Sequence, residues 1–166
     1  MTKNPIITIR DAVPQDVGLI LGFIRKKAAF DGVPHWVEAT EEKLQRELFG
    51  QHPKAFVLFA EVGGHVVGFA IYFLTFSSFM ARPGIWLDDL FVDEGARGQG
   101  AGKTLLAHLA KLADERGYGR VEWVTAAGNA NGLAFYQRNG ARVQDVVRVL
   151  RLDRPAISHL AQHGAA

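Results

Sequence analysis

A glycine-rich segment stands out among the residues whose types and spacing could do chemistry. Residues 97–104 read Arg-Gly-Gln-Gly-Ala-Gly-Lys-Thr, after an apolar β-rich run and before leucines at helical spacing. Backbone N–H groups at a helix N-terminus have no partner within the helix, and the helix dipole is positive there. Glycines let a ligand approach such a backbone closely. The segment therefore predicts an anion site, for which a phosphate is the natural ligand.

Two nucleotide-binding patterns match this segment only in part. The phosphate loop of nucleoside triphosphatases has the pattern G-x-x-x-x-G-K-[ST]. Gly102-Lys103-Thr104 match its end, but Arg97 stands at the position of its first glycine. The dinucleotide fingerprint G-x-G-x-x-G fits at Gly98 and Gly100 and then meets Lys103 in place of its third glycine. Each pattern misses one position, so a triphosphatase and a dehydrogenase stay as alternatives.

A third pattern, [Q/R]-x-x-G-x-[G/A], is matched in full by Arg97, Gly100 and Gly102. In this form the segment resembles motif A of the GCN5-related N-acetyltransferases, which bind acetyl-CoA. The stretches that support this resemblance on either side are Leu90-Phe91-Val92, Asn129, Ala134-Phe135-Tyr136 and Asn139-Gly140-Ala141. Within that family the chain is most similar to the diamine (spermidine/spermine) N-acetyltransferases, through the stretches 49–53, 67–73 and 87–92.

The resemblance implies where acetyl-CoA binds as a cosubstrate. Its pantetheine would run beside the strand that ends in Leu90, Phe91 and Val92, which a bulge splays from its neighbour, and freed N–H groups there would bond the thioester carbonyl. Asn129 would lie on the pantetheine or adenosine side and Arg138 near the 3′-phosphate. The residues expected around the diphosphate are Arg97, Gly98, Gly100, Gly102 and Lys103.

The resemblance also implies two catalytic side chains. Tyr136 matches the general acid that protonates the departing thiolate, and Asp88 matches the carboxylate that binds the amine and accepts its proton. An amine with a pKa near that of Lys, about 10, must lose a proton before it attacks. Asp88 and Asp89 would point to opposite faces of a regular strand, so both can serve one site only if a bulge turns one of them. Further expected substrate-binding residues are Asp31 and Glu38.

The acceptor amine is less defined than the cosubstrate. Ala127, Gly128, Val146 and Val147 stand where the diamine branch carries acids or tryptophans that line its polyamine site. A diamine, a polyamine, a lysine-like small molecule and a peptide or protein amine all remain possible acceptors, with direct attack in a ternary complex. A non-catalytic module that binds acyl-CoA and regulates is a further alternative.

Composition narrows the class of protein. The 166 residues carry 19 basic and 17 acidic side chains, a net charge of +2 that does not predict a nucleic-acid partner. There is no cysteine, hence no disulfide framework or thiolate metal site, and histidine spacing predicts no metal. No run of about twenty apolar residues indicates a membrane span. We expect a cytoplasmic enzyme without metal, and the family resemblance implies a homodimer.

Periodicity places these residues on an α/β unit with the order β-α-α-β-β-β-α-β-α-β. The expected strands are Ile6–Arg10, Ala55–Val62, His65–Phe76, Ile85–Val92, Val121–Ala126 and Val143–Leu152. The expected helices follow Pro14, Thr40, the glycine loop at 93–102, and Asn129. The resemblance implies a mixed, mostly antiparallel sheet with a splayed parallel pair and flanking helices. We expect one N-acetyltransferase domain over residues 1–153 and a C-terminal tail over 154–166.

Overall fold

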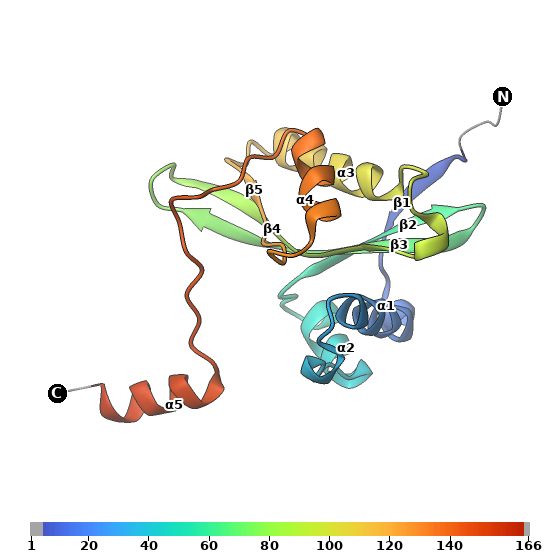
Figure 1. Ribbon diagram of the computed structural model, residues 1–166. Coiled ribbons are helices and arrows are strands. Elements are labelled where there is room, and N and C mark those ends of the chain that lie inside the picture. Colours follow the sequence, from blue (N-terminus) through green and yellow to red (C-terminus); the bar gives the residue numbers. More distant parts are fainter. Residues whose placement is uncertain (1–4, 165–166) are drawn as a thin grey trace. The chain divides into compact units, whose positions relative to one another are not determined.

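The computed structural model describes residues 5–164, which group into two compact units, a first that ends at Asn129 and a second that begins at Ala130. The first unit is built on a five-stranded sheet in which each strand neighbours the next in sequence (Figure 1). Its strands are β1 (Ile7–Asp11), β2 (Phe56–Val62), β3 (His65–Ser77), β4 (Arg82–Val92) and β5 (Val121–Glu122). The predicted mixed α/β fold is confirmed.

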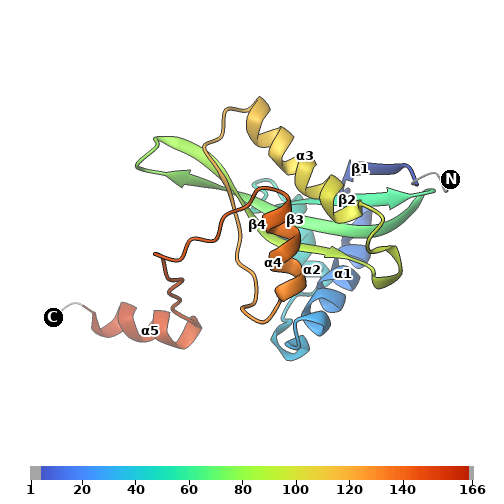
Figure 2. The same cartoon turned by 45° about the horizontal axis from the view of Figure 1, so that its top comes forward.

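Helices cover both faces of this sheet, as Figures 1 and 2 show for the first unit. On one face lies α3 (Ala101–Glu115), whose Leu105 and Leu109 are fully buried against β2, β3 and β4. On the other lie α1 (Val17–Phe30) and α2 (Glu41–Phe49). Each helix has one apolar stripe, and burying that stripe against the sheet is what stabilises it. The sheet therefore separates two hydrophobic cores, one on each of its faces.

Local signals in the sequence set the ends of these helices. Pro14 opens the short 3-10 turn Pro14–Asp16 that leads into α1. The Thr40 hydroxyl accepts a hydrogen bond from the N–H of Lys43 at 3.2 Å, which caps α2 as predicted. Gly117 follows α3 with φ of 65°, a left-handed conformation suited to glycine.

The strand pairing contains the expected parallel pair. Strands β1 to β4 pair antiparallel, and β2 and β3 are joined at Gly63-Gly64, where both φ angles are positive. Strand β5 runs parallel to β4 and pairs with it only at Ile85 and Trp86. From Leu87 onward β4 has no β5 neighbour, which agrees with the predicted splay.

The structure corrects the prediction at the C-terminal end of the chain. The strand expected over Val143–Leu152 is irregular and exposed, with Val146 and Leu150 each 92% accessible. Alternating β-branched residues favour an extended backbone, but a strand exists only where a neighbouring edge accepts its hydrogen bonds. The strand expected over Val121–Ala126 shortens to the two residues of β5 for the same reason.

The second unit contains two helices, α4 (Ala130–Arg138) and α5 (Arg154–His163). The first ends before Gly140, whose φ is 93°, as its glycine predicts. The second occupies most of the expected tail and is capped by the preceding Asp153, whose carboxylate accepts from the N–H of Ala156 at 3.0 Å. Residues 165–166 of that tail, and residues 1–4 of the expected domain, lie outside the described residues.

Gly68 is the strand residue whose replacement tests the packing of β3 against β4. A Cβ at this position would lie 2.8 Å from the carbonyl oxygen of Phe91 and 3.0 Å from Cγ2 of Val92. We expect Gly68→Ala to lower the free energy of unfolding by about 1–3 kcal/mol, measured by urea denaturation. The matched control is Gly22→Ala in α1, where a Cβ meets no atom within 4 Å. Gly22→Ala should raise the free energy of unfolding by up to about 1 kcal/mol, because alanine favours a helix more than glycine does. Equal decreases in both variants would contradict this packing of β3 against β4.

Candidate active site

A one-residue bulge interrupts β4 at the pair of aspartates. Tyr72 of β3 lies opposite Leu87 and Ile71 opposite Asp89, which leaves Asp88 as the extra residue. Leu87 and Leu90 both pack in the α3-side core although they are three residues apart, because the bulge shifts the alternation by one. The conditional prediction that a bulge turns one of the two aspartates agrees with this register.

After the bulge, the residues of β4 that face α1 are Asp89 and Phe91. Asp89 Oδ1 lies 3.8 Å from Nζ of Lys27 on α1, and that ammonium also hydrogen-bonds the carboxylate of Asp31. The three side chains are between 21 and 29% exposed, so they are partly withdrawn from solvent. We call Asp31, Asp88, Asp89 and Lys27 the carboxylate cluster. It joins the end of α1 to the centre of β4.

The environment of Asp89 changes its acidity. Burial raises the pKa of Asp89 above its ordinary value, and the charges of Asp88 and Asp31 act in the same direction. The Lys27 ammonium opposes this shift but does not cancel it. A carboxylate with a raised pKa is a stronger base, which suits it to take a proton from an ammonium group.

Two aromatic rings and an arginine lie beside the cluster. The rings of Phe30 and Phe91 meet edge to face with centroids 6.0 Å apart. The Arg97 guanidinium lies 4.7 Å from the centroid of Phe30 and 5.3 Å from that of Phe91, and its Nε donates to the carbonyl of Val92 at 2.9 Å. Arg97 thus links the end of β4 to α1 through stacking and one hydrogen bond.

The glycine loop, residues 93–102, runs from the end of β4 into the start of α3 and carries backbone N–H donors. A 3-10 turn, Glu94–Ala96, leads to Gly98 and Gly100, whose φ angles of 74° and 102° are left-handed. Gly100 begins α3, and its carbonyl accepts from the N–H and the hydroxyl of Thr104. The first helical N–H groups, from Ala101 through 103, have no acceptor within the helix. Within residues 5–164, and apart from the two chain neighbours of Gly98, no atom lies within 4 Å of the position that a Cβ would take there.

This donor set fits a diphosphate. Several exposed N–H groups, the positive end of a 15-residue helix and the exposed Lys103 converge on one short segment. Gly102 lies on the first turn of α3 within it. The predicted anion-binding residues are therefore brought together, although whether they bind coenzyme A stays a prediction.

The remaining predicted site residues belong to other segments of the chain. Asn129 closes the first unit, and its amide donates to the hydroxyl of Thr125 at 3.3 Å. Tyr136 and Arg138 lie on α4 in the second unit, where the Tyr136 ring meets that of Phe135 at 5.1 Å. Glu38 precedes α2 and is exposed, and its main-chain carbonyl accepts from Nζ of Lys43.

Sequence reasoning missed Lys27 and Phe30. A signal for Lys27 exists, because it precedes Asp31 by four residues on a predicted helix, the spacing at which opposite charges pair. No signal singles out Phe30, because its partners Phe91 and Arg97 are remote in sequence.

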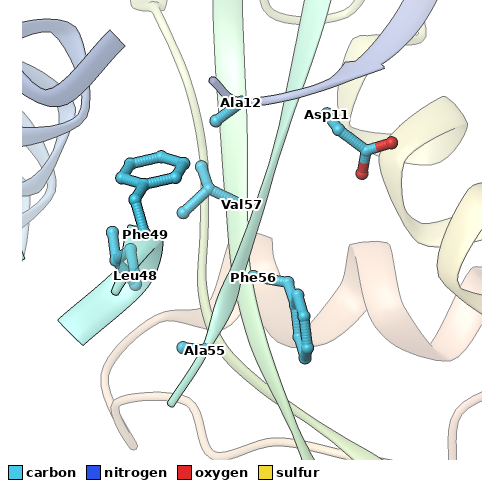
Figure 3. A pocket seen from close by; sticks show the side chains of 7 residues that line it. All are labelled: Asp11, Ala12, Leu48, Phe49, Ala55, Phe56 and Val57. Atoms are coloured by element: carbon cyan, nitrogen blue, oxygen red, sulfur yellow. The ribbon is translucent and has the colours of Figure 1, made fainter. Parts of the chain in front are cut away.

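A separate pocket lies between the end of α2 and the start of β2 (Figure 3). Figure 3 shows Leu48, Phe49 and Val57 on one side of β2 and Phe56 on the other. Asp11 is the one charged residue of its lining. The pocket contains no residue of the predicted site.

Among residues 5–164, no group of three or more His, Asp or Glu is arranged to hold a metal ion, and no helix is long and apolar enough to cross a membrane.

Asp89 gives a pH-dependent prediction. Between its ordinary pKa of about 4 and its raised pKa, the folded protein binds more protons than the unfolded chain, so stability falls as pH rises. Asp89→Asn removes this contribution. We expect the Tm of the variant minus that of the wild type to become more positive from about pH 4 to about pH 7. Asp114→Asn on exposed helix surface is the control, and a trend of opposite sign in Asp89→Asn would contradict the assignment.

Two curated relatives span most of this chain. L-ornithine N5-acetyltransferase NATA1 of Arabidopsis thaliana is 29% identical over 194 residues, which cover 90% of this chain and 85% of that protein. Spermidine/spermine N(1)-acetyltransferase-like protein 1 of Homo sapiens is 29% identical over 147 residues, which cover 84% of this chain but 21% of that protein. The resemblance to the diamine branch agrees with the second of these.

The chain is also similar to a solved structure and to the sequence profile of a protein family. An integron cassette protein from the mobile metagenome of V. cholerae matches with a TM-score of 0.78 and 25% identity, over 94% of this chain and 98% of that one. The profile of the Acetyltransferase (GNAT) family matches residues 23–141, which include the carboxylate cluster, the glycine loop and Tyr136. The chain therefore belongs to the GNAT family of acetyltransferases.

Proposed function

We propose that the chain transfers an acetyl group from acetyl-CoA to a small primary amine by direct attack in a ternary complex. One observation carries this proposal: Asp31 and Asp89 already hold a primary ammonium, that of Lys27, beside the strand that leads into the glycine loop. The cluster holds three carboxylates and one ammonium, so negative charge remains to bind the ammonium group of an acceptor.

The glycine loop would hold the cosubstrate, which supplies an acetyl group activated as a thioester. N–H groups from Gly98 through Lys103 would donate to the diphosphate, together with the guanidinium group of Arg97. Asn129 and Arg138 would add contacts along the pantetheine or adenosine and at the 3′-phosphate. Leu90, Phe91 and Val92 lie beyond the part of β4 that pairs with β5, so N–H groups of this stretch that point away from β3 would bond the pantetheine.

The carboxylate cluster would bind the acceptor and remove its proton. An ammonium group is no nucleophile, so a carboxylate or a water between them must accept a proton before attack. Asp88 is exposed at the bulge, so it can meet the acceptor and accept its proton directly or through a water, and Asp89, whose pKa is raised by burial, is a second carboxylate beside it. Glu38 is a further proposed acceptor contact.

Tyr136 would protonate the departing thiolate. The ordinary pKa of a tyrosine is about 10 and that of a thiol about 8.5. Tyr136 therefore gives the proton up at modest cost and holds it until the thiolate forms.

The relatives support small amines as acceptors. One is named for L-ornithine, an amino acid with a terminal amine, and another for spermidine and spermine, which are polyamines. A peptide or protein amine and a purely regulatory acyl-CoA module are the alternatives. The acid–base pair of Asp88 and Tyr136 favours catalysis, because a module that only binds needs neither.

We propose further that the domain spans residues 1–153, that it works in the cytoplasm without metal, and that it forms a homodimer. The net charge of +2 favours a small molecule over a nucleic acid as the partner, and we propose no membrane partner. Exposed apolar residues in the extended stretch 143–152 support the homodimer, since a second copy would remove them from water.

The direct test is thiol release from acetyl-CoA across a panel of amines. The panel contains putrescine, spermidine, L-ornithine, a lysine analogue and a peptide with a free N-terminus. We expect release above background with at least one small amine, and product mass should increase by one acetyl group. Release with the peptide alone would favour the peptide acceptor, and no release with any amine would favour the regulatory module.

Tyr136→Phe separates proton donation from binding. We expect kcat to fall by about 10²-fold, the range typical of a lost general acid, while the Kd for coenzyme A changes less than about twofold. The control is Tyr118→Phe, which removes the hydroxyl that accepts from Arg116 after α3. Equal losses in kcat and in coenzyme A affinity would show that the Tyr136 hydroxyl is not the donor.

A further inference from the structure

Lys27 differs from the neighbouring lysine on α1 in what its ammonium contacts. Its side chain is 21% exposed and bridges Asp31 and Asp89, whereas that of Lys26 is 52% exposed and pairs with Asp93 at 2.8 Å. Ion pairs at fully exposed sites contribute little, and partial withdrawal from water strengthens them. Lys27 is therefore a fixed positive charge within the carboxylate cluster.

This charge changes what the cluster can bind. The carboxylates of Asp31, Asp88 and Asp89 would together carry three negative charges, and Lys27 reduces that sum by one. An ammonium group has three donors, so contacts with two carboxylates leave Lys27 a donor for a third group. A carboxylate on the acceptor would satisfy that donor, while the ammonium group of the acceptor would pair with the exposed Asp88.

We infer that Lys27 is a specificity-determining residue that favours acceptor amines carrying a carboxylate, of the amino-acid type, over diamines that lack one. The inference rests on the proposed function and narrows its acceptor class. A carboxylate on the acceptor pairs with the Lys27 ammonium. A diamine has no carboxylate to pair there, so discrimination comes from this one attraction.

L-ornithine and putrescine test this directly, because they share a four-carbon diamine skeleton and differ by one carboxylate group. We would measure kcat/KM for both acceptors at saturating acetyl-CoA, in the wild type and in Lys27→Gln. We expect the ratio of ornithine to putrescine to fall by about tenfold in the variant, since the attraction for the carboxylate is lost, whereas any repulsion of the two amino groups is common to both acceptors and cancels in the ratio.

Two further variants separate charge from structure. Lys27→Arg keeps the positive charge, so it should keep the wild-type ratio within about threefold. Lys26→Gln removes a charge from the adjacent position that pairs with Asp93 outside the cluster, so its ratio should equal that of the wild type. Thermal unfolding of each variant reports whether it is folded, and calorimetry gives the ratio of the two acceptors' Kd values even for a variant that does not turn over.

The outcomes separate this inference from the function beneath it. Acetyl transfer by the wild type with the same ratio in Lys27→Gln would overturn the inference and leave the proposed function standing. An equal change of the ornithine-to-putrescine ratio in Lys26→Gln would also overturn it, because the ratio would then depend on the net charge of this surface and not on the position of Lys27. Absence of transfer to any amine by the wild type would overturn the proposed function and the inference together.

Discussion

The one-residue bulge at Asp88 is the constraint on which the site depends. Without it, Leu87 and Leu90 would face opposite sides of the sheet, and one of the two cores would receive a charged side chain. With it, both leucines serve the α3 core while Asp89 and Phe91 face α1. The register shift thus satisfies the apolar packing and gathers carboxylates beside α1 at the same place.

The site holds charged side chains that are partly buried, which costs free energy, and contacts with neighbouring groups reduce that cost. Asp89 is destabilised as a carboxylate, as the direction of its pKa shift shows, and Lys27 offsets part of this cost. Arg97 lies against two aromatic rings and donates to the end of β4, so its charge is held by stacking as well as by hydrogen bonding. Such costs are typical of a site built for binding or catalysis.

Features with local causes could be predicted from the sequence. The Thr40 cap, the Gly63-Gly64 turn and the glycine loop before α3 each depend on a few adjacent residues, and the structure contains all three. The stretch 143–152 failed as a strand because β-branched residues specify an extended backbone and not the edge that must pair with it. Lys27 was overlooked because the importance of its charge depends on Asp89, which lies 62 positions away (89 − 27 = 62) and reaches α1 only through the bulge.

The central claim is that the backbone donors at the start of α3 hold the diphosphate of coenzyme A. A crystal structure of the chain with coenzyme A bound tests it most directly. The account predicts diphosphate oxygens within hydrogen-bond distance, about 3 Å, of several N–H groups from Gly98 through Lys103. A diphosphate bound at any other part of the chain, with these N–H groups turned to solvent, would contradict it.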